Sequence, residues 1–271
     1  SKSTHLHHNV DVLIVGAGLA GLLAAKKLAG TDQDVLLIEK DHNLGGILRN
    51  SNKIKTIDGQ KSTDWIEKTE WLLKSANNIK ILKNTTVTTY NYKDHLVAIE
   101  DKSVGTLPDN NKPELIMHKI RTRHTVLANG HIERFLSFRN NDLPGIMLAA
   151  SFEKYIHRYG VIADTGPVIF TNNSSTFSLL KTLVDMNHKP KAYVDIRDSK
   201  KIEKQTLELI NNHNIPFYPK SEIEGCEGKN QIEKVFIRTK KDKTLKIKTS
   251  MLCISGGLNP DIHLFTQSKG L

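Results

Sequence analysis

The segment from Val10 to Glu39 constrains the fold of this chain more than any other segment. It opens with an apolar run, VDVLIV, which is rich in β-branched residues and too short for a helix, so it predicts a buried parallel strand. Glycines in the pattern G-x-G-x-x-G follow at once. Gly16 would permit a tight turn, Gly18 would let a pyrophosphate approach the backbone, and Gly21 would let a helix pack close to the strand.

A helix and a second strand complete this unit. Leu19 to Ala29 reads as a helix whose N-terminus would present free N–H groups and the positive end of its dipole to a diphosphate. The next apolar run, Val35 to Ile38, ends in Glu39, which is placed to accept hydrogen bonds from ribose hydroxyls and to repel a 2′-phosphate. The segment therefore predicts a site for NAD or FAD rather than NADP. The alternative is the same fold without a bound dinucleotide.

Composition narrows the class of protein. The chain has 271 residues, 38% of them hydrophobic, which is enough for one large or two modest cores. No apolar run reaches about 18 residues, and the first residues lack the apolar middle of a signal peptide, so we expect no membrane association. The two cysteines, Cys226 and Cys253, lie far apart without a C-x-x-C motif. This excludes a mechanism based on paired thiols and favours a cytoplasmic protein.

The formal net charge of +10 suggests an anionic partner at first sight. The lysines are scattered, however, and the one dense stretch, Lys240 to Lys248, lacks interleaved aromatic residues, so we expect no nucleic-acid binding. His5, His7 and His8 have no acidic or cysteine neighbour in the sequence. We therefore predict a solvated N-terminal arm and no metal site.

Two features follow the second predicted strand. Gly45 and Gly46 lie in a loop that should face the nucleotide, where paired glycines let the backbone approach a ligand; an ordinary turn is the alternative. The segment from Ser62 to Ala76 predicts a helix with Ser62 or Thr63 as its cap. Its tryptophans, at positions 65 and 71, are predicted to belong to a buried stripe.

A β-meander is predicted next. Thr85 to Tyr92 and His95 to Glu100 alternate as strands around a turn at Lys93-Asp94, and a polar loop from Gly105 to Lys112 follows. Leu115 to Leu127 is predicted to carry two more strands. Val87, where the parallel strands give way to the meander, is a candidate adenine contact.

Ala128, Asn129 and Gly130 form a turn of small residues after these strands. In reductases with two dinucleotide sites an A-T-G turn occupies this place and brings the chain back beside the cofactor. Asn129 stands here where threonine is usual, and we include the three residues in the cofactor site.

A second βαβ unit lacks the glycines of the first. Pro167 to Thr171 and Ala192 to Ile196 read as strands, with a helix from Ser175 to Met186 between them. The turn reads T-N-N-S-S, whose side chains would crowd the place of a pyrophosphate, although Asp195 is still positioned to hold a ribose. We therefore predict a degenerate second site.

The predicted fold class is α/β, with two Rossmann-like dinucleotide-binding domains of three layers each, in which a central parallel sheet is joined to a β-meander. The second domain, residues 141–253, is inserted in the first, residues 1–140. Residues 254–271 return to the first domain, which we expect either to continue in a longer polypeptide or to be naturally open.

Three motifs resemble the α subunit of heterotetrameric sarcosine oxidase, a family of amine-oxidising complexes. They are NNDLPGIMLA at Asn140 to Ala149, FTNNSS at Phe170 to Ser175, and SGGLNPDIHLFTQSKG at Ser255 to Gly270. The opening HLHHNVDVLIVGAG and the stretch VLANGHIER agree with them, so the resemblance extends over essentially the whole chain.

This resemblance implies a pyridine nucleotide–disulfide oxidoreductase domain that binds NAD noncovalently at the first site. It also implies a β subunit as partner, which holds most of the flavin, and oxidation of CH–NH donors: sarcosine becomes glycine, with formaldehyde or methylene-tetrahydrofolate and peroxide as products. The isolated fragment should be inactive. The candidate cofactor-binding residues are Gly16, Ala17, Gly18, Leu19, Ala20, Gly21, Glu39, Lys40, Gly45, Gly46, Val87, Ala128, Asn129 and Gly130.

No catalytic residue is predicted, because the sequence shows no nucleophile–base pair. His118, His124, His131 and His157 are single histidines without a readable partner. Two alternatives remain open for function: an FAD-binding subunit of a proline, opine or glycine dehydrogenase, and a scaffold whose dinucleotide only holds a subunit interface.

Overall fold

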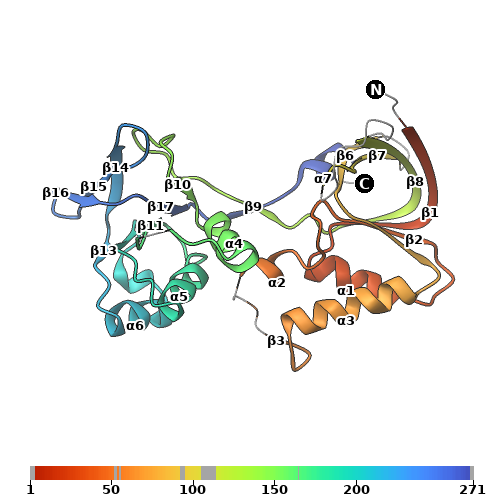
Figure 1. Ribbon diagram of the computed structural model, residues 1–271, viewed down its shortest axis with the longest axis horizontal. Helices are drawn as coiled ribbons and strands as arrows, with labels where there is room; N and C mark the ends of the chain where they lie inside the picture. Colours follow the sequence, from red (N-terminus) through yellow and green to blue (C-terminus); the bar gives the residue numbers. More distant parts are fainter. Residues whose placement is uncertain are drawn as a thin grey trace. The chain divides into compact units, whose positions relative to one another are not determined.

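The computed structural model describes residues 4–51, 54, 56–91, 95–104, 114–163 and 165–268. The chain divides into two compact units (Figure 1). Unit 1 comprises Ser1–Arg49, Ile54–His131 and Pro260–Leu271, and unit 2 comprises Asn50–Lys53 and Ile132–Asn259. The predicted turn at Lys93-Asp94 and the predicted loop from Gly105 to Lys112 lie outside the described residues.

Unit 1 is built on a mixed six-stranded sheet. Its strand order is β5 (Ile79–Leu82), β2 (Val35–Ile38), β1 (Thr4–Val15), β8 (Leu115–Leu127), β7 (His95–Asp101) and β6 (Thr85–Asn91). The first four strands are parallel, and β7 runs antiparallel to both β8 and β6. The parallel sheet joined to a meander thus has the predicted form.

Both faces of the central strands are buried, which explains why β1 and β2 end in unbroken apolar runs. On one face, Ile14 packs with α1 (Leu19–Leu28) and α3 (Ser62–Ser75). On the other face, Leu13 belongs to a cluster that includes Leu264 of α7 (His263–Gln267). Short elements complete the unit: α2 (Ile47–Asn50), β3 (Thr56–Ile57) and β4 (Gln60–Lys61).

Three details of unit 1 differ from the sequence prediction. The segment from Leu115 to Leu127 is one continuous strand, because β1 and β7 together supply backbone partners along it. In α3, Trp65 is buried but Trp71 is 72% exposed. The buried residues of this helix recur at Trp65, Thr69 and Leu73, and Trp71 falls on the opposite face. The Ser62 hydroxyl donates to the Ile54 carbonyl rather than capping the helix.

From Thr4 onward this segment forms a strand, so the predicted arm is part of the sheet, while His5 and His7 are exposed to solvent as predicted. From Thr4 onward, β1 pairs in parallel register with β8. His8 Nε2 lies 2.9 Å from His118 Nδ1, and His118 Nε2 lies 3.0 Å from Glu100 Oε2. Lys102 Nζ lies 2.6 Å from the other oxygen of Glu100. These contacts and the backbone pairing with β8 hold this part of β1 in the sheet.

The contact between His8 and His118 predicts that the free energy of unfolding depends on pH. Burial lowers the pKa of His8, and Lys80, His118 and His7 act in the same direction against the opposing charge of Glu100. Neutral His8 therefore stabilises the folded state, and this contribution to the free energy of unfolding is complete above the ordinary pKa of 6.5. The contribution is lost as the pH falls below 6.5 toward the lowered pKa of the folded state. We expect His8→Gln to make the free energy of unfolding, measured with urea between about pH 7.5 and 5.5, less pH-dependent. His42→Gln at an exposed position is the control and should retain the wild-type slope; an unchanged slope for His8→Gln would contradict the prediction.

Unit 2 has a fully parallel five-stranded sheet at its centre. Its order is β10 (Ile146–Leu148), β17 (Leu252–Ser255), β11 (Val168–Thr171), β12 (Ala192–Asp195) and β13 (Phe217–Pro219). Three helices cover one face: α4 (Ala149–Tyr159), α5 (Phe177–Asp185) and α6 (Lys204–Asn212). The antiparallel sheet of β14 (Glu222–Glu227), β15 (Lys234–Arg238) and β16 (Thr244–Lys248) covers the other.

This three-layer arrangement confirms the predicted α/β fold class (Figure 1). The remaining elements are β9 (His131–Glu133), which pairs with β18 (Leu258–Pro260), and the 3₁₀ turn η1 (Ser199–Lys201). Within the described ranges, no helix is long and apolar enough to span a membrane.

Candidate functional site

The glycine turn between β1 and α1 is tightly packed at two positions and open at the third. Gly16 has φ +97°, and a Cβ there would lie 2.4 Å from the Ala128 carbonyl oxygen. A Cβ at Gly21 would lie 1.8 Å from the Gly16 carbonyl oxygen. A Cβ at Gly18 would meet no atom within 4 Å. The fold therefore requires two of the glycines, and the third leaves free space at the surface of the turn.

The free space lies at the start of α1. Gly18 is the N-cap residue of this helix, and no side chain of the described chain caps it. The first N–H groups of a helix have no partner within the helix, and they carry the positive end of its dipole. Leu19, Ala20 and Gly21 thus present backbone donors suited to an anion such as a diphosphate.

Glu39 lies against this turn as the sequence predicts for the acid at the end of the second strand. The side chain is buried, and its Oε2 accepts a hydrogen bond from Ala17 N at 2.7 Å. Its Oε1 accepts from Asp41 N at 2.8 Å. The two carboxylate oxygens retain lone pairs that can accept ribose hydroxyls. Lys40, the next residue, is exposed.

The paired glycines also contact the turn. Gly45 N donates to the Ala17 carbonyl at 2.8 Å, and a Cβ at Gly46 would lie 3.2 Å from Gly18 Cα. Both glycines have positive φ, +114° and +51°, so this loop reaches the turn in a conformation that side chains rarely adopt. Gly45 and Gly46 are therefore brought together with the glycine turn by backbone contact.

The small-residue turn after β8 joins the same place. Ala128 N donates to the Val15 carbonyl at 2.8 Å. The side-chain oxygen Oδ1 of Asn129 is buried and has no hydrogen-bond partner among the residues that the structure describes. A buried acceptor without a partner is costly, and a donor on a bound cofactor would satisfy it. The residues present thus fit a dinucleotide.

Val87 differs from the other candidate site residues. It is 8% exposed and belongs to the apolar cluster on the face of the sheet opposite α1.

The corresponding turn of unit 2 is filled by its own side chains. Asn173 Nδ2 donates to the Ser255 carbonyl at 3.0 Å, and Asn173 Oδ1 accepts from Ser175 N at 2.8 Å. Arg197 donates to both oxygens of the fully buried Asp195, at 3.1 and 2.9 Å. The acid that the sequence offered as a ribose ligand is thus already paired.

Two of the four single histidines of the sequence have side-chain partners, and the other two, His124 and His131, are exposed. Besides His118, which contacts Glu100, His157 Nε2 lies 3.1 Å from the Thr182 hydroxyl. Both cysteines are buried, and burial raises the pKa of Cys226 to about 12. Sequence reasoning missed Glu133, whose Oε2 accepts from Ala150 N at 2.8 Å at the start of α4 and whose pKa is raised by burial. Among the described residues, no group of His, Cys, Asp and Glu side chains is arranged to hold a metal ion.

Curated relatives are similar to this chain over nearly its whole length. Three relatives share the name sarcosine oxidase subunit alpha, at 29–32% identity. The subunit from Corynebacterium sp. (strain P-1) is 32% identical over 98% of this chain. The chain spans only 28% of that relative's length. The resemblance predicted from the three motifs is thereby confirmed.

Solved structures share the fold. The thioredoxin reductase of T. acidophilum superimposes with a TM-score of 0.70 at 16% identity, over 96% of this chain and 81% of that one. The L-proline dehydrogenase of P. horikoshii gives 0.67 at 22% identity, over 99% of this chain and 46% of that one. Residues 10–271 match the family described as pyridine nucleotide-disulphide oxidoreductase. Because this match covers nearly the whole chain, the chain belongs to the pyridine nucleotide-disulphide oxidoreductase family.

Proposed function

We propose that unit 1 binds NAD at the glycine turn. The observation that carries this proposal is the open surface at Gly18, bounded by the uncapped start of α1 and by the buried Glu39 carboxylate. The diphosphate would accept from Leu19, Ala20 and Gly21, and the adenosine ribose would donate to Glu39.

The surrounding residues have more limited proposed roles. Gly16 and Ala17 shape the turn, and Gly45 and Gly46 keep side chains away from it. Ala128 and Gly130 flank Asn129, whose unpartnered oxygen would accept from the cofactor. Lys40, the exposed residue after Glu39, would contact the ribose, and Val87 would contact the adenine.

We further propose that this chain is the NAD-binding part of the α subunit of a cytoplasmic, sarcosine oxidase-like complex. NAD, when bound, supplies a nicotinamide that can accept a hydride. This chain's residues bind and orient the nucleotide, and the amine is oxidised with flavin held mainly by a β subunit. The complex would convert sarcosine, dioxygen and water to glycine, formaldehyde and hydrogen peroxide. With tetrahydrofolate as the acceptor in place of water, methylene-tetrahydrofolate would form instead of formaldehyde. The shared names of the relatives support this assignment, and the isolated chain should not turn over sarcosine.

FAD at the same turn is the second candidate. The glycine turn and Glu39 would recognise the ADP portion, which NAD and FAD share. The fold shared with an L-proline dehydrogenase favours this reading, in which the chain is a flavin-binding subunit of a related dehydrogenase. A nucleotide that only holds a subunit interface is the remaining alternative.

Calorimetric titration with NAD, NADP and FAD tests these candidates. We expect NAD to bind and NADP to bind at least about 100-fold more weakly, because its 2′-phosphate would lie beside the buried Glu39 carboxylate. Glu39→Gln should weaken NAD binding and reduce the difference between NAD and NADP. A yellow protein that retains FAD would support the second candidate instead. Equal affinities for NAD and NADP, or no binding of either, would contradict the NAD proposal.

A further inference from the structure

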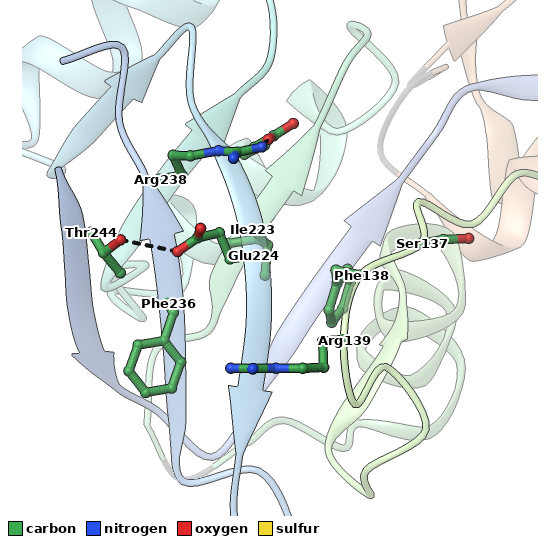
Figure 2. Close-up of a pocket in the computed structure, with 9 residues that line it drawn as sticks. Ser137, Phe138, Arg139, Ile223, Glu224, Phe236, Arg238 and Thr244 are labelled. Carbon is green, nitrogen blue, oxygen red and sulfur yellow. Dashed lines mark hydrogen bonds and ion pairs between the residues drawn. The ribbon is translucent and has the colours of Figure 1, made fainter. Parts of the chain in front are cut away.

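A pocket of about 630 Å³ lies within unit 2 on the outer face of the β14–β15–β16 sheet (Figure 2). Side chains alternate across a strand, so Ile223 and Ile237 face the core while Glu222, Glu224 and Phe236 are on the other face. The segment from Ser137 to Arg139 runs beside β14 and forms one wall. Pockets that bind small molecules commonly measure about 300–1,000 Å³.

Arg139 reaches into this pocket by crossing β14 at a glycine. A Cβ at Gly225 would lie 3.1 Å from Arg139 Cβ and 3.2 Å from Arg139 Nε, so the missing side chain at Gly225 makes room for the arginine. Gly225 pairs with Phe236 in the sheet, and in Figure 2 the arginine extends toward the Phe236 ring. Within the described ranges, no hydrogen bond or ion pair holds the Arg139 guanidinium.

A carboxylate is available on the other side of the pocket. Glu222 forms an ion pair with Arg238, so these two charges offset one another. Glu224 Oε2 accepts from the Thr244 hydroxyl at 3.0 Å, a neutral partner that leaves the carboxylate charged (Figure 2). With Glu222 paired to Arg238, the pocket presents one guanidinium, at Arg139, and one carboxylate, at Glu224, whose charge also acts on Arg238. The half-buried ring of Phe236 provides an apolar surface in the same pocket, and Lys246 Nζ lies over this ring, 6.0 Å from its centroid.

We propose that this pocket binds a small zwitterion, an amino acid with an aromatic or large apolar side chain. The ligand carboxylate would pair with the Arg139 guanidinium, a geometry that arginine forms with two parallel hydrogen bonds. The ligand ammonium would donate to Glu224, and the ligand side chain would stack on Phe236. All these residues belong to unit 2, so the site is independent of the NAD proposal for unit 1.

The test compares phenylalanine with two analogues that each lack one charge. In N-acetylphenylalanine a neutral acetamide replaces the ammonium, and in phenylalaninamide a neutral carboxamide replaces the carboxylate. Binding to the 271-residue chain is followed by chemical shifts of backbone amides in β14 and β15 at low salt. We expect phenylalanine to bind at least about 10-fold more tightly than either analogue, since each lost charge removes a charge-assisted hydrogen bond.

Two variants test which residue recognises each charge of the ligand. Arg139→Gln should remove the preference for phenylalanine over phenylalaninamide, and Glu224→Gln should remove its preference over N-acetylphenylalanine. Both residues are exposed, so the fold should tolerate these changes. Lys240→Gln, in the exposed turn between β15 and β16, is the matched control and should bind as wild type. Equal affinity for all three ligands, no binding at about 10 mM, or unchanged preferences in the variants would overturn the proposal.

Discussion

Gly18→Val is expected to lower the affinity of the chain for NAD by at least about 100-fold while the protein stays folded. Gly18 has extended backbone angles, φ −72° and ψ −170°, which β-branched residues readily adopt. A Cβ there meets no protein atom within 4 Å, so the unliganded fold accepts the side chain. The valine methyl groups would occupy the space through which a diphosphate must approach the N–H groups of α1. Calorimetric titration with NAD, together with the midpoint of urea unfolding, measures both effects.

Two further variants make this result interpretable. Gly18→Ala should lower the affinity by a smaller factor, because one methyl group fills less of the space. Leu23→Val changes a residue of the same helix that is 42% exposed and should leave the affinity unchanged. If Gly18→Val binds NAD as tightly as the wild type, the nucleotide does not lie at this turn.

Gly21→Ala is expected to have the opposite outcome, a loss of stability of about 3 kcal/mol or more. The added Cβ would lie 1.8 Å from the Gly16 carbonyl oxygen, and both groups are fixed in the backbone. The turn cannot easily move, because Gly16 N donates to the Ile38 carbonyl at 2.8 Å and Gly16 itself contacts Ala128. The variant must therefore separate α1 from β1, at the centre of unit 1. The shift of the urea midpoint at constant slope gives the change in the free energy of unfolding.

Gly18→Ala serves as the matched control for this second result, since it adds the same methyl group three residues earlier in open space. Its free energy of unfolding should equal that of the wild type. A Gly21→Ala variant with wild-type stability would show that the helix packs less closely on the strand than the structure indicates.

The sequence predicted local features of this fold well. The order of strand, glycine turn, helix and strand between Val10 and Glu39 is encoded by neighbouring residues, because apolar periodicity and turn glycines act over a few positions. The position of Glu39 beside the turn follows from the parallel pairing of β1 with β2. The same reasoning placed both strands around the turn at Thr171 to Ser175 in unit 2.

The sequence did not show which residues far apart in the chain contact one another. His8 meets His118, which is 110 positions away in the sequence, so nothing near His8 indicated that the N-terminal residues form a strand. Arg139 and Gly225 are similarly distant, and a single glycine in a strand gives no sign of which side chain crosses it. Trp71 was misplaced because α3 is apolar over neighbouring positions, where the sequence leaves the buried face ambiguous. The sequence also left open whether Asp195 is free to hold a ribose, because its partner Arg197 lies just beyond the predicted strand.

The two buried thiols have a practical consequence for studying this chain. Cys226 and Cys253 are both 0% exposed, and burial raises the pKa of each, so neither offers a thiolate to oxidants or to maleimide dyes under native conditions. A cysteine introduced at an exposed position, such as Trp71 on α3, would be the sole reactive thiol of the folded chain. A fluorophore can thus be attached at a single chosen place without first removing the natural cysteines.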